Sequence, residues 1–138
     1  ATEFISSLTD NLAQSYGVDR TRIDIQLDLA PLTLSMNRSL PLGLIVNELV
    51  SNAFKHAFPD NRSGSLTVAL QHGDNGQVLL SVTDTGVGLP PDKRAGSGDT
   101  LGFRLVEALA MQIDAQLSVN NSHPTRFDLR FALEPAEG

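Results

Sequence analysis

The sequence predicts an α+β fold, a two-layer α/β sandwich in which a mixed, mostly antiparallel sheet carries three main helices on one face. Three stretches repeat apolar residues at the period of an amphipathic helix, and six short stretches alternate apolar and polar residues as half-buried strands do. Their order is helix, two strands, helix, two strands, long loop, helix, two strands. This order lacks the regular strand–helix–strand alternation of a doubly wound fold, which favours helices gathered on one side of the sheet.

Length and composition fit a single domain over residues 1–138. With 138 residues, 41% of them hydrophobic, the chain is large enough to bury a core without disulfides or metal ions. It has no cysteine and only three scattered histidines, which excludes disulfides and the usual zinc sites. No apolar run reaches the roughly 18 to 20 residues that span a bilayer, and no signal peptide is visible, so we expect a soluble cytoplasmic domain without direct membrane contact.

The net charge of −6, with ten Lys and Arg residues spread along the chain, argues against a nucleic-acid surface, which needs a basic stripe. We therefore expect no nucleic-acid partner. A phosphate ligand held by backbone amides and Mg²⁺ remains compatible with this charge.

The first stretch, residues 3–16, repeats apolar residues at helical spacing and is followed by Gly17, which is typical of a helix end. The chain begins inside this pattern, and we expect it to be a fragment of a longer protein. Residues 23–29 and 32–36 alternate apolar and polar residues on either side of a proline-containing break, which predicts two short strands in a hairpin.

Residues 42–58, LGLIVNELVSNAFKHAF, predict the central helix, with apolar residues gathered on the side that faces the core. Ser39 is the expected N-cap of this helix. Pro41 fits its first turn, because the proline nitrogen has no hydrogen to leave unpaired. Pro59 ends the helix, since the residue before a proline avoids helical geometry.

The other side of this helix carries Glu48, Asn52 and Lys55 at positions i, i+4 and i+7, with His56 beside them. Mg²⁺ prefers oxygen ligands and keeps several waters, so one amide or carboxylate oxygen together with substrate phosphates is enough to bind it. A lysine can neutralise phosphate charge. This face therefore suits a metal-bound polyanion; the alternative is a polar helix face that only contacts water.

The second half of the chain predicts a hairpin, a loop, a helix and two strands. Residues 65–84 alternate on either side of the turn HGDNG and predict two paired strands. Residues 85–100 contain four glycines and two prolines and predict a loop. Helical spacing resumes over residues 101–113, and residues 117–119 and 127–133 predict the closing strands.

Asp84 ends the returning strand and is followed by Gly86 and Gly88. A carboxylate at the inner end of a strand needs a hydrogen-bond donor, and the exocyclic amine of a purine is a suitable one. The two glycines would let the backbone approach a flat ring. The alternative is an ordinary turn, since Asp-x-Gly is a common turn signal.

Small residues precede the third helix in the stretch GSGDTLG, residues 96–102. Free N–H groups at a helix start favour anions such as phosphates. The stretch is neither a Walker loop, because no Gly-Lys-Ser/Thr follows it, nor a dinucleotide-binding G-x-G-x-x-G motif. A glycine-rich helix cap is the alternative.

In this order, the signals resemble the catalytic and ATP-binding domain of bacterial sensor histidine kinases, within the wider group that includes gyrase, Hsp90 and MutL ATPases. NELVSNAFKHAF resembles the N box, DTGVGLP the G1 box, GSGDTLGFRLV the G2 box, and TRFDLRF the penultimate strand of that family. The resemblance covers nearly the whole chain. It implies the Bergerat ATP-binding fold, with ATP and Mg²⁺ as ligands.

The resemblance implies a role for each matching residue, with Glu48, Asn52 and Lys55 as the catalytic set. Asn52 would ligate Mg²⁺, and Glu48 is both a second candidate ligand and the candidate base. Lys55 and His56 would lie beside the phosphates or ribose, and Asp84 would accept the adenine amino group. The other expected ATP-binding residues are Gly86, Gly88, Gly98, Thr100, Leu101, Gly102 and Thr125, the last at the position that usually supports the adenine.

The resemblance also implies a protein histidine kinase of a two-component system. This domain would donate the γ-phosphoryl group of ATP to a histidine on a dimerisation domain absent from this chain, and alone it would bind nucleotide but transfer little. A response regulator receiver domain would be the next partner, and the parent would be a homodimer. The N box and the LGFRLV form of the G2 box look closer to the HisKA_2/HWE-like branch, which is often joined to light or PAS sensors.

Three alternatives have different chemistry. The first is a GHKL-type ATPase that uses Glu48 to activate water, and the second is a serine kinase of the anti-sigma type. The third is a non-catalytic nucleotide-binding regulatory module. The lid of this chain is short, because only seven residues separate Gly88 from Gly96.

Overall fold

The computed structural model describes residues 2–19, 21–32, 34–57, 63–73, 76–85, 101–120 and 125–132. Its elements are α1 (Thr2–Ser15), β1 (Ile23–Leu29), α2 (Met36–Asn52), the π-helical turn η1 (Ala53–Ala57), β2 (Gly64–His72), β3 (Gln77–Asp84), α3 (Leu101–Gln112), β4 (Gln116–Asn120) and β5 (Thr125–Ala132).

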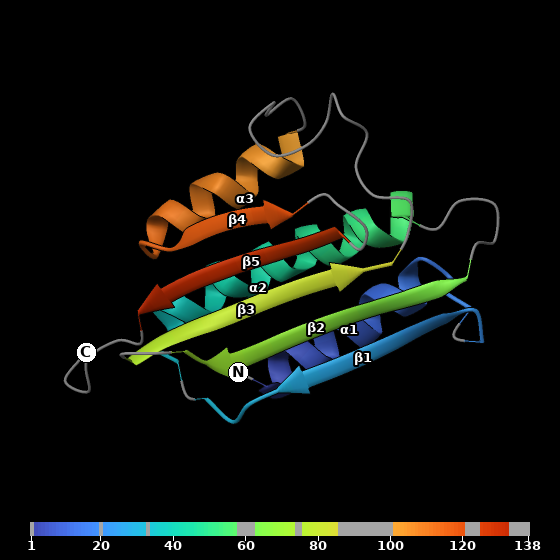
Figure 1. Ribbon diagram of the computed structural model, residues 1–138, viewed down its shortest axis with the longest axis horizontal. Coiled ribbons are helices and arrows are strands. Elements are labelled where there is room, and N and C mark those ends of the chain that lie inside the picture. The colour runs from blue at the N-terminus through green and yellow to red at the C-terminus, as the bar shows by residue number, and fades with distance from the viewer. Residues whose placement is uncertain are drawn as a thin grey trace.

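The fold is a five-stranded sheet with three helices packed on one of its faces, which confirms the predicted two-layer architecture (Figure 1). The strand order is β1-β2-β3-β5-β4. β1 pairs with β2 in parallel, and the other three pairings are antiparallel. The sheet is therefore mixed and mostly antiparallel, as expected.

The hairpin expected between residues 23–29 and 32–36 is wrong. Only β1 forms, and the Ala30 N–H still donates to the Leu70 carbonyl at 2.7 Å before the chain leaves the sheet. Because β1 and β2 run in parallel, the chain must cross over between them through a long connection, and α2 with η1 supplies it. Leu32 is buried in the core from the connecting segment rather than from a strand.

The start of α2 also differs from the prediction. The N-cap is Ser35, not Ser39, and the Ser39 hydroxyl donates to the Ser35 carbonyl at 3.0 Å from inside the helix. Pro41 lies within α2 rather than at its start. It cannot donate to the carbonyl of Asn37 one turn earlier, but that residue is exposed, so water can serve the carbonyl instead.

The end of the central helix is wound differently from an α-helix. The α-helical part ends at Asn52, and a π-helical turn continues it from Ala53 to Ala57. The Ala53 N–H is still shared between the carbonyls of Leu49 and Val50, as in the last turn of an α-helix, and the π winding follows it. π-helical turns are rare and are frequent at functional sites.

The core lies between the sheet and the helices. Alternate residues of β2 and β3 point into it, and one side of α2 covers them. The buried residues from these three elements include Leu66, Val68, Leu70, Val78, Leu80, Val82, Leu42, Ile45, Val46, Leu49 and Val50. No helix in the described ranges is long and apolar enough to cross a membrane.

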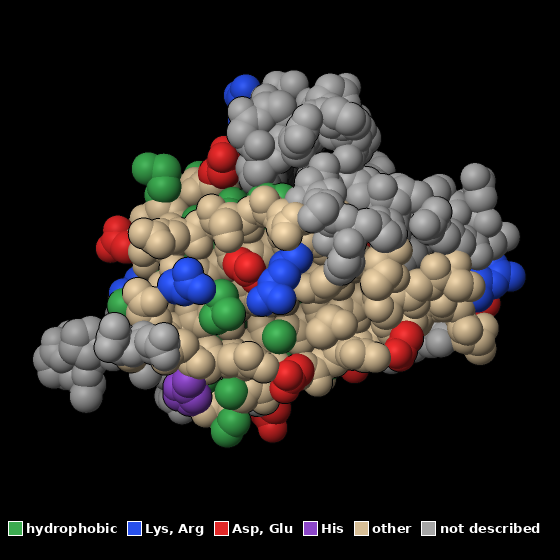
Figure 2. Space-filling view, viewed as in Figure 1, with side chains coloured by type: hydrophobic (Ala, Val, Ile, Leu, Met, Phe, Trp, Pro, Cys, Tyr) green, Lys and Arg blue, Asp and Glu red, His purple; other side chains and the backbone are tan. Residues whose placement is uncertain are grey.

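The other face of the sheet is polar. Ser81 on β3 donates to Asp128 Oδ1 on β5 at 2.7 Å, and Arg126 Nε donates to the same oxygen at 2.7 Å. Figure 2 shows this face, with charged side chains spread over the strands and few hydrophobic ones. The strand alternation therefore separates an apolar helix-covered face from a polar open face.

Candidate functional site

The elements that carry the predicted site residues meet at one end of the molecule. The last residues of α2 with η1, the end of β3, the start of β5 and the start of α3 all lie at this end (Figure 1). Motifs far apart in the sequence are thus brought to one region, which is the arrangement that a single ligand site requires.

Asp84 and Thr125 form a buried polar pair at this end of the sheet. They are register partners on β3 and β5, and Asp84 also pairs with Leu66 on β2. Their exposed fractions are 7% and 2%. Asp84 continues the buried row of Val78, Leu80 and Val82, so the alternation that builds the core also points this carboxylate to the helix side of the sheet.

The Thr125 hydroxyl oxygen is buried and finds no hydrogen-bond partner among the described residues. Burying a hydroxyl without a partner costs about 1–3 kcal/mol, so such a group is normally retained for a ligand or an ordered water. Together with the carboxylate of its register partner Asp84, this hydroxyl makes a buried polar pair, whose chemistry suits the polar edge of a purine.

The backbone just after Asp84 is held in place. The Thr85 N–H donates to the Ser65 carbonyl at 3.1 Å, and the Ser65 N–H donates to Thr85 Oγ1 at 2.9 Å. These two bonds extend the pairing of β3 with β2 by one residue. The backbone is therefore hydrogen-bonded both before and after Asp84, which fixes the side of the sheet on which its carboxylate lies.

Glu48 and Asn52 lie one turn apart on α2, and both are half-buried. Lys55 lies on η1 and is exposed. Glu48 and Lys55 were expected on one face of an α-helix, seven residues apart. A π-turn has more residues per turn than an α-helix, so it rotates Lys55 away from that position. The two oxygen-bearing side chains suit a hydrated Mg²⁺, which needs few protein ligands.

No group of three or more His, Cys, Asp or Glu side chains within the described ranges could hold a metal ion. A cation at Asn52 would therefore take other ligands from water and from a bound polyanion.

The G1 and G2 residues Gly86, Gly88, Gly98 and Thr100 lie outside the described residues. Leu101 and Gly102 form the first two positions of α3, where N–H groups have no partner within the helix. Their amides are thus in the position that was expected to face phosphates, and the helix dipole adds positive potential there. The backbone of His56 belongs to η1.

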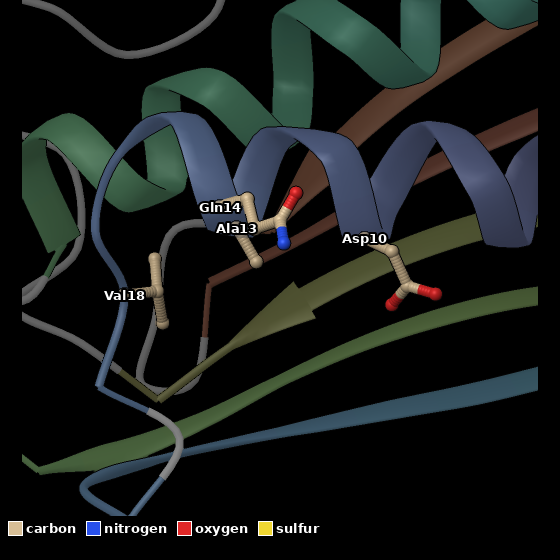
Figure 3. A pocket seen from close by; sticks show the side chains of 4 residues that line it. All are labelled: Asp10, Ala13, Gln14 and Val18. Atoms are coloured by element: carbon tan, nitrogen blue, oxygen red, sulfur yellow. The ribbon is translucent and has the colours of Figure 1, made fainter.

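A cavity of about 400 Å³ lies beside the end of α1 (Figure 3). Asp10, Ala13, Gln14 and Val18 line it. None of the described residues expected to bind nucleotide is among these four.

The sequence interpretation missed one contact at the site. The rings of Tyr16, just after α1, and Phe54, on η1, have centroids 6.2 Å apart and planes inclined by 52°. The sequence predicted Tyr16 only as the last residue of the first helical stretch, 3–16. The helical apolar pattern gives no signal for this contact, because it depends on where the π-turn places Phe54.

Comparison with known families and proteins agrees with this geometry. The family model described as "Histidine kinase-, DNA gyrase B-, and HSP90-like ATPase" matches residues 37–135. The chain is 35% identical over 78 residues to blue-light-activated histidine kinase 2 of Erythrobacter litoralis, which covers 56% of this chain and 22% of that protein. It is 30% identical over 98 residues to sensor histidine kinase PdtaS of Mycobacterium tuberculosis, covering 70% of this chain and 19% of that protein.

The chain spans about a fifth of the length of these curated relatives. Among solved structures, the histidine kinase domain from the Erythrobacter litoralis EL346 blue-light activated histidine kinase matches with a TM-score of 0.86 and 25% identity, over 94% of this chain and 59% of that chain. The mycobacterial sensor histidine kinase MprB matches with a TM-score of 0.74 and 23% identity, over 97% of this chain and 96% of that chain. The second similarity shows a common fold.

Proposed function

Since the chain belongs to the family of histidine kinase-, DNA gyrase B- and HSP90-like ATPases, we propose that it is the catalytic and ATP-binding domain of a sensor histidine kinase. In its parent protein it donates the γ-phosphoryl group of Mg-ATP to a histidine on a dimerisation domain outside this chain. The observation that carries the proposal is the buried pair of Asp84 and Thr125, which are register partners on the helix-covered face of the sheet. The named relatives support the kinase over the other members of the family.

Each residue of the site has one task in this proposal. Asp84 accepts the hydrogen bond of the adenine amino group, and Thr125 supports the same edge of the base. Asn52 holds Mg²⁺, with Glu48 as a second oxygen donor one turn away. The cation supplies neutralisation of phosphate charge, to which Lys55 adds.

Catalysis in this proposal consists of positioning and charge stabilisation. The N–H groups at the start of α3 meet the phosphates, so that charge developing on the transferred group faces preorganised donors. Holding the γ-phosphoryl group in line with the acceptor converts a bimolecular encounter into a step within one complex. The phosphoacceptor domain of the same kinase and a response regulator receiver domain are the partners, and we place the domain in the cytoplasm, where ATP is available.

Nucleotide binding by the domain is tested by calorimetric titration with a non-hydrolysable ATP analogue, with and without Mg²⁺, and with GTP as the competing base. We expect adenine-selective binding that Mg²⁺ strengthens. Asp84→Asn should weaken it by about tenfold or more, because a charged acceptor is worth roughly 1.5–3 kcal/mol. Asp128→Asn is the matched control, since this carboxylate lies on the open face of the sheet.

Equal affinity for ATP and GTP, or unchanged affinity in Asp84→Asn, would refute the assigned base site.

Phosphoryl transfer is tested in the intact parent. Asn52→Ala should abolish autophosphorylation, because it removes the proposed cation ligand, whereas Asn37→Ala in the exposed first turn of the same helix should leave it intact. Undiminished autophosphorylation of the parent protein carrying Asn52→Ala would refute the kinase assignment. Steady phosphate release by the isolated domain, lost in Glu48→Gln, would instead identify an ATPase.

A further inference from the structure

Tyr16 and Phe54 link the first helix to the segment that carries the proposed phosphate-binding residues. Phe54 packs against the hydrophobic core on one side and meets the Tyr16 ring on the other, at a centroid distance of 6.2 Å. Tyr16 keeps 40% of its surface exposed, so the ring pair lies at the surface of the domain. A tilted ring pair of this kind is worth about 0.5–1.5 kcal/mol beyond the area that it buries.

The backbone fixes where the Tyr16 ring lies. Gly17 has a φ of 61°, which ends α1 in a left-handed residue. The Val18 N–H donates to the Ala13 carbonyl at 2.9 Å, and the Gly17 N–H donates to the Gln14 carbonyl at 3.1 Å. These are the two bonds of a Schellman motif, in which Tyr16 is the C-cap residue. The ring therefore projects from a rigid helix end.

Phe54 stands between the two residues that were assigned to the cation and the phosphates. Asn52 is the last residue of α2, and Lys55 follows Phe54 within η1. A π-turn is less stable by itself than a continued α-helix, so tertiary contacts must hold it. The ring contact with Tyr16 is such a contact, and it acts on Phe54, one of the two residues between Asn52 and Lys55.

We propose that Tyr16 and Phe54 are positioning residues for Mg-ATP, which hold the π-turn so that the Asn52 and Lys55 side chains face the same phosphate group. This inference rests on the proposed function. The proposed base region at Asp84 and Thr125 lies on β3 and β5, whereas Phe54 lies on η1. The two rings should therefore affect phosphate binding, and most of all its Mg²⁺-dependent part, for which Asn52 is the proposed ligand.

The measurement is the ratio of the dissociation constants of the ATP analogue without and with Mg²⁺, taken on the whole domain. In Tyr16→Leu and in Phe54→Leu this ratio should fall about two- to tenfold, the range expected for loss of an aromatic pair. Affinity without Mg²⁺ should fall less than affinity with Mg²⁺, because only the contact of Lys55 with the phosphates is then disturbed. Tyr16→Phe keeps the ring and should keep the ratio, which separates ring packing from any role of the hydroxyl.

The matched control is Phe4→Leu. Phe4 lies near the other end of α1, where its ring packs directly on Gly43 of the same central helix and leaves no room for a Cβ there. This variant disturbs the contact between the two helices but not the π-turn, so the ratio should not change. The double variant Tyr16→Leu/Phe54→Leu should lose no more than the larger single loss, because both changes break one contact.

An unchanged ratio in both single leucine variants overturns the inference, as does an equal loss of affinity with and without Mg²⁺, which a general loss of folding would produce. Additive losses in the double variant also overturn it. A wild-type domain that binds no adenine nucleotide removes the proposed function itself, and with it this inference. The outcomes for the two proposals are thus distinct.

Discussion

At the scale of single residues, we expect the buried hydroxyl of Thr125 to contribute to ligand binding but not to the stability of the fold. Its oxygen has no partner among the described residues, although only 2% of the residue is exposed. Thr125→Val keeps the shape and removes the polar atom. We expect the free energy of unfolding to stay unchanged or to rise by up to about 1 kcal/mol, because a desolvated oxygen disappears.

Urea unfolding of Thr125→Val checks this expectation, and titration with the ATP analogue should show weaker binding in the same variant. A clear loss of stability would mean that the hydroxyl is already satisfied in the free domain.

Asp84 and Thr125, the buried polar pair at the end of β3 and the start of β5, differ in how far the sequence predicted their roles. Asp84 stood out because a carboxylate at the inner end of an alternating strand needs a hydrogen-bond donor; the structure shows it buried, and its binding role stays a prediction. Thr125 was assigned through family resemblance alone. Its position beside Asp84 depends on the pairing of β3 with β5, which sequence spacing does not reveal.

At the scale of elements, α1 and α3 end in the same way with different residues. Asp114 has a φ of 53°, and the Ala115 N–H donates to the Ala110 carbonyl at 2.8 Å, as in the Schellman motif at Gly17. A left-handed conformation is costly for any residue with a Cβ, and a carboxylate at a helix C-terminus opposes the dipole. Asp114→Gly should therefore raise the free energy of unfolding by about 0.5–1 kcal/mol.

Gly17→Ala is the counterpart, because it introduces a Cβ at a φ of 61° and should lower stability by about 1 kcal/mol. Thermal and urea unfolding of both variants give the comparison. The same sign of change in the two variants would contradict the account of these helix ends.

Element boundaries were the least predictable part of the fold. The alternation of Leu32, Leu34 and Met36 fits a strand, but the parallel pairing of β1 with β2 turned this segment into the approach to a crossover helix. In the same topology, α2 begins at Met36, earlier than the predicted start near Pro41. The π-turn at Ala53 has no local signal, since its winding depends on tertiary contacts.

At the scale of the whole molecule, the sheet divides a packed side from a polar side. Substitution of two adjacent residues of β3, one on each side, tests this division. Leu80 on β3 is 1% exposed and belongs to the core, whereas Leu79 is half-buried on the open face. Leu80→Ala should cost about 2–5 kcal/mol of unfolding free energy, because the cavity lies between the sheet and the helices.

Leu79→Ala should lower the free energy of unfolding by less than half as much as Leu80→Ala, since water can fill the space that the Leu79 side chain leaves. Urea denaturation of the two variants measures the difference, and comparable losses would show that the open face is packed in solution.

The position of β3 in the middle of the sheet has a consequence for how a nucleotide is received. β3 is hydrogen-bonded to β2 on one side and to β5 on the other up to Asp84, so its amides can exchange with solvent only when much of the domain opens. Lys55, in contrast, stands exposed on a short turn at the surface. The proposed base site is thus built on the central strand of the sheet and the proposed phosphate site on the turn η1 at the end of α2, so base recognition depends on strand pairing while phosphate binding depends on contacts such as that of Tyr16 with Phe54.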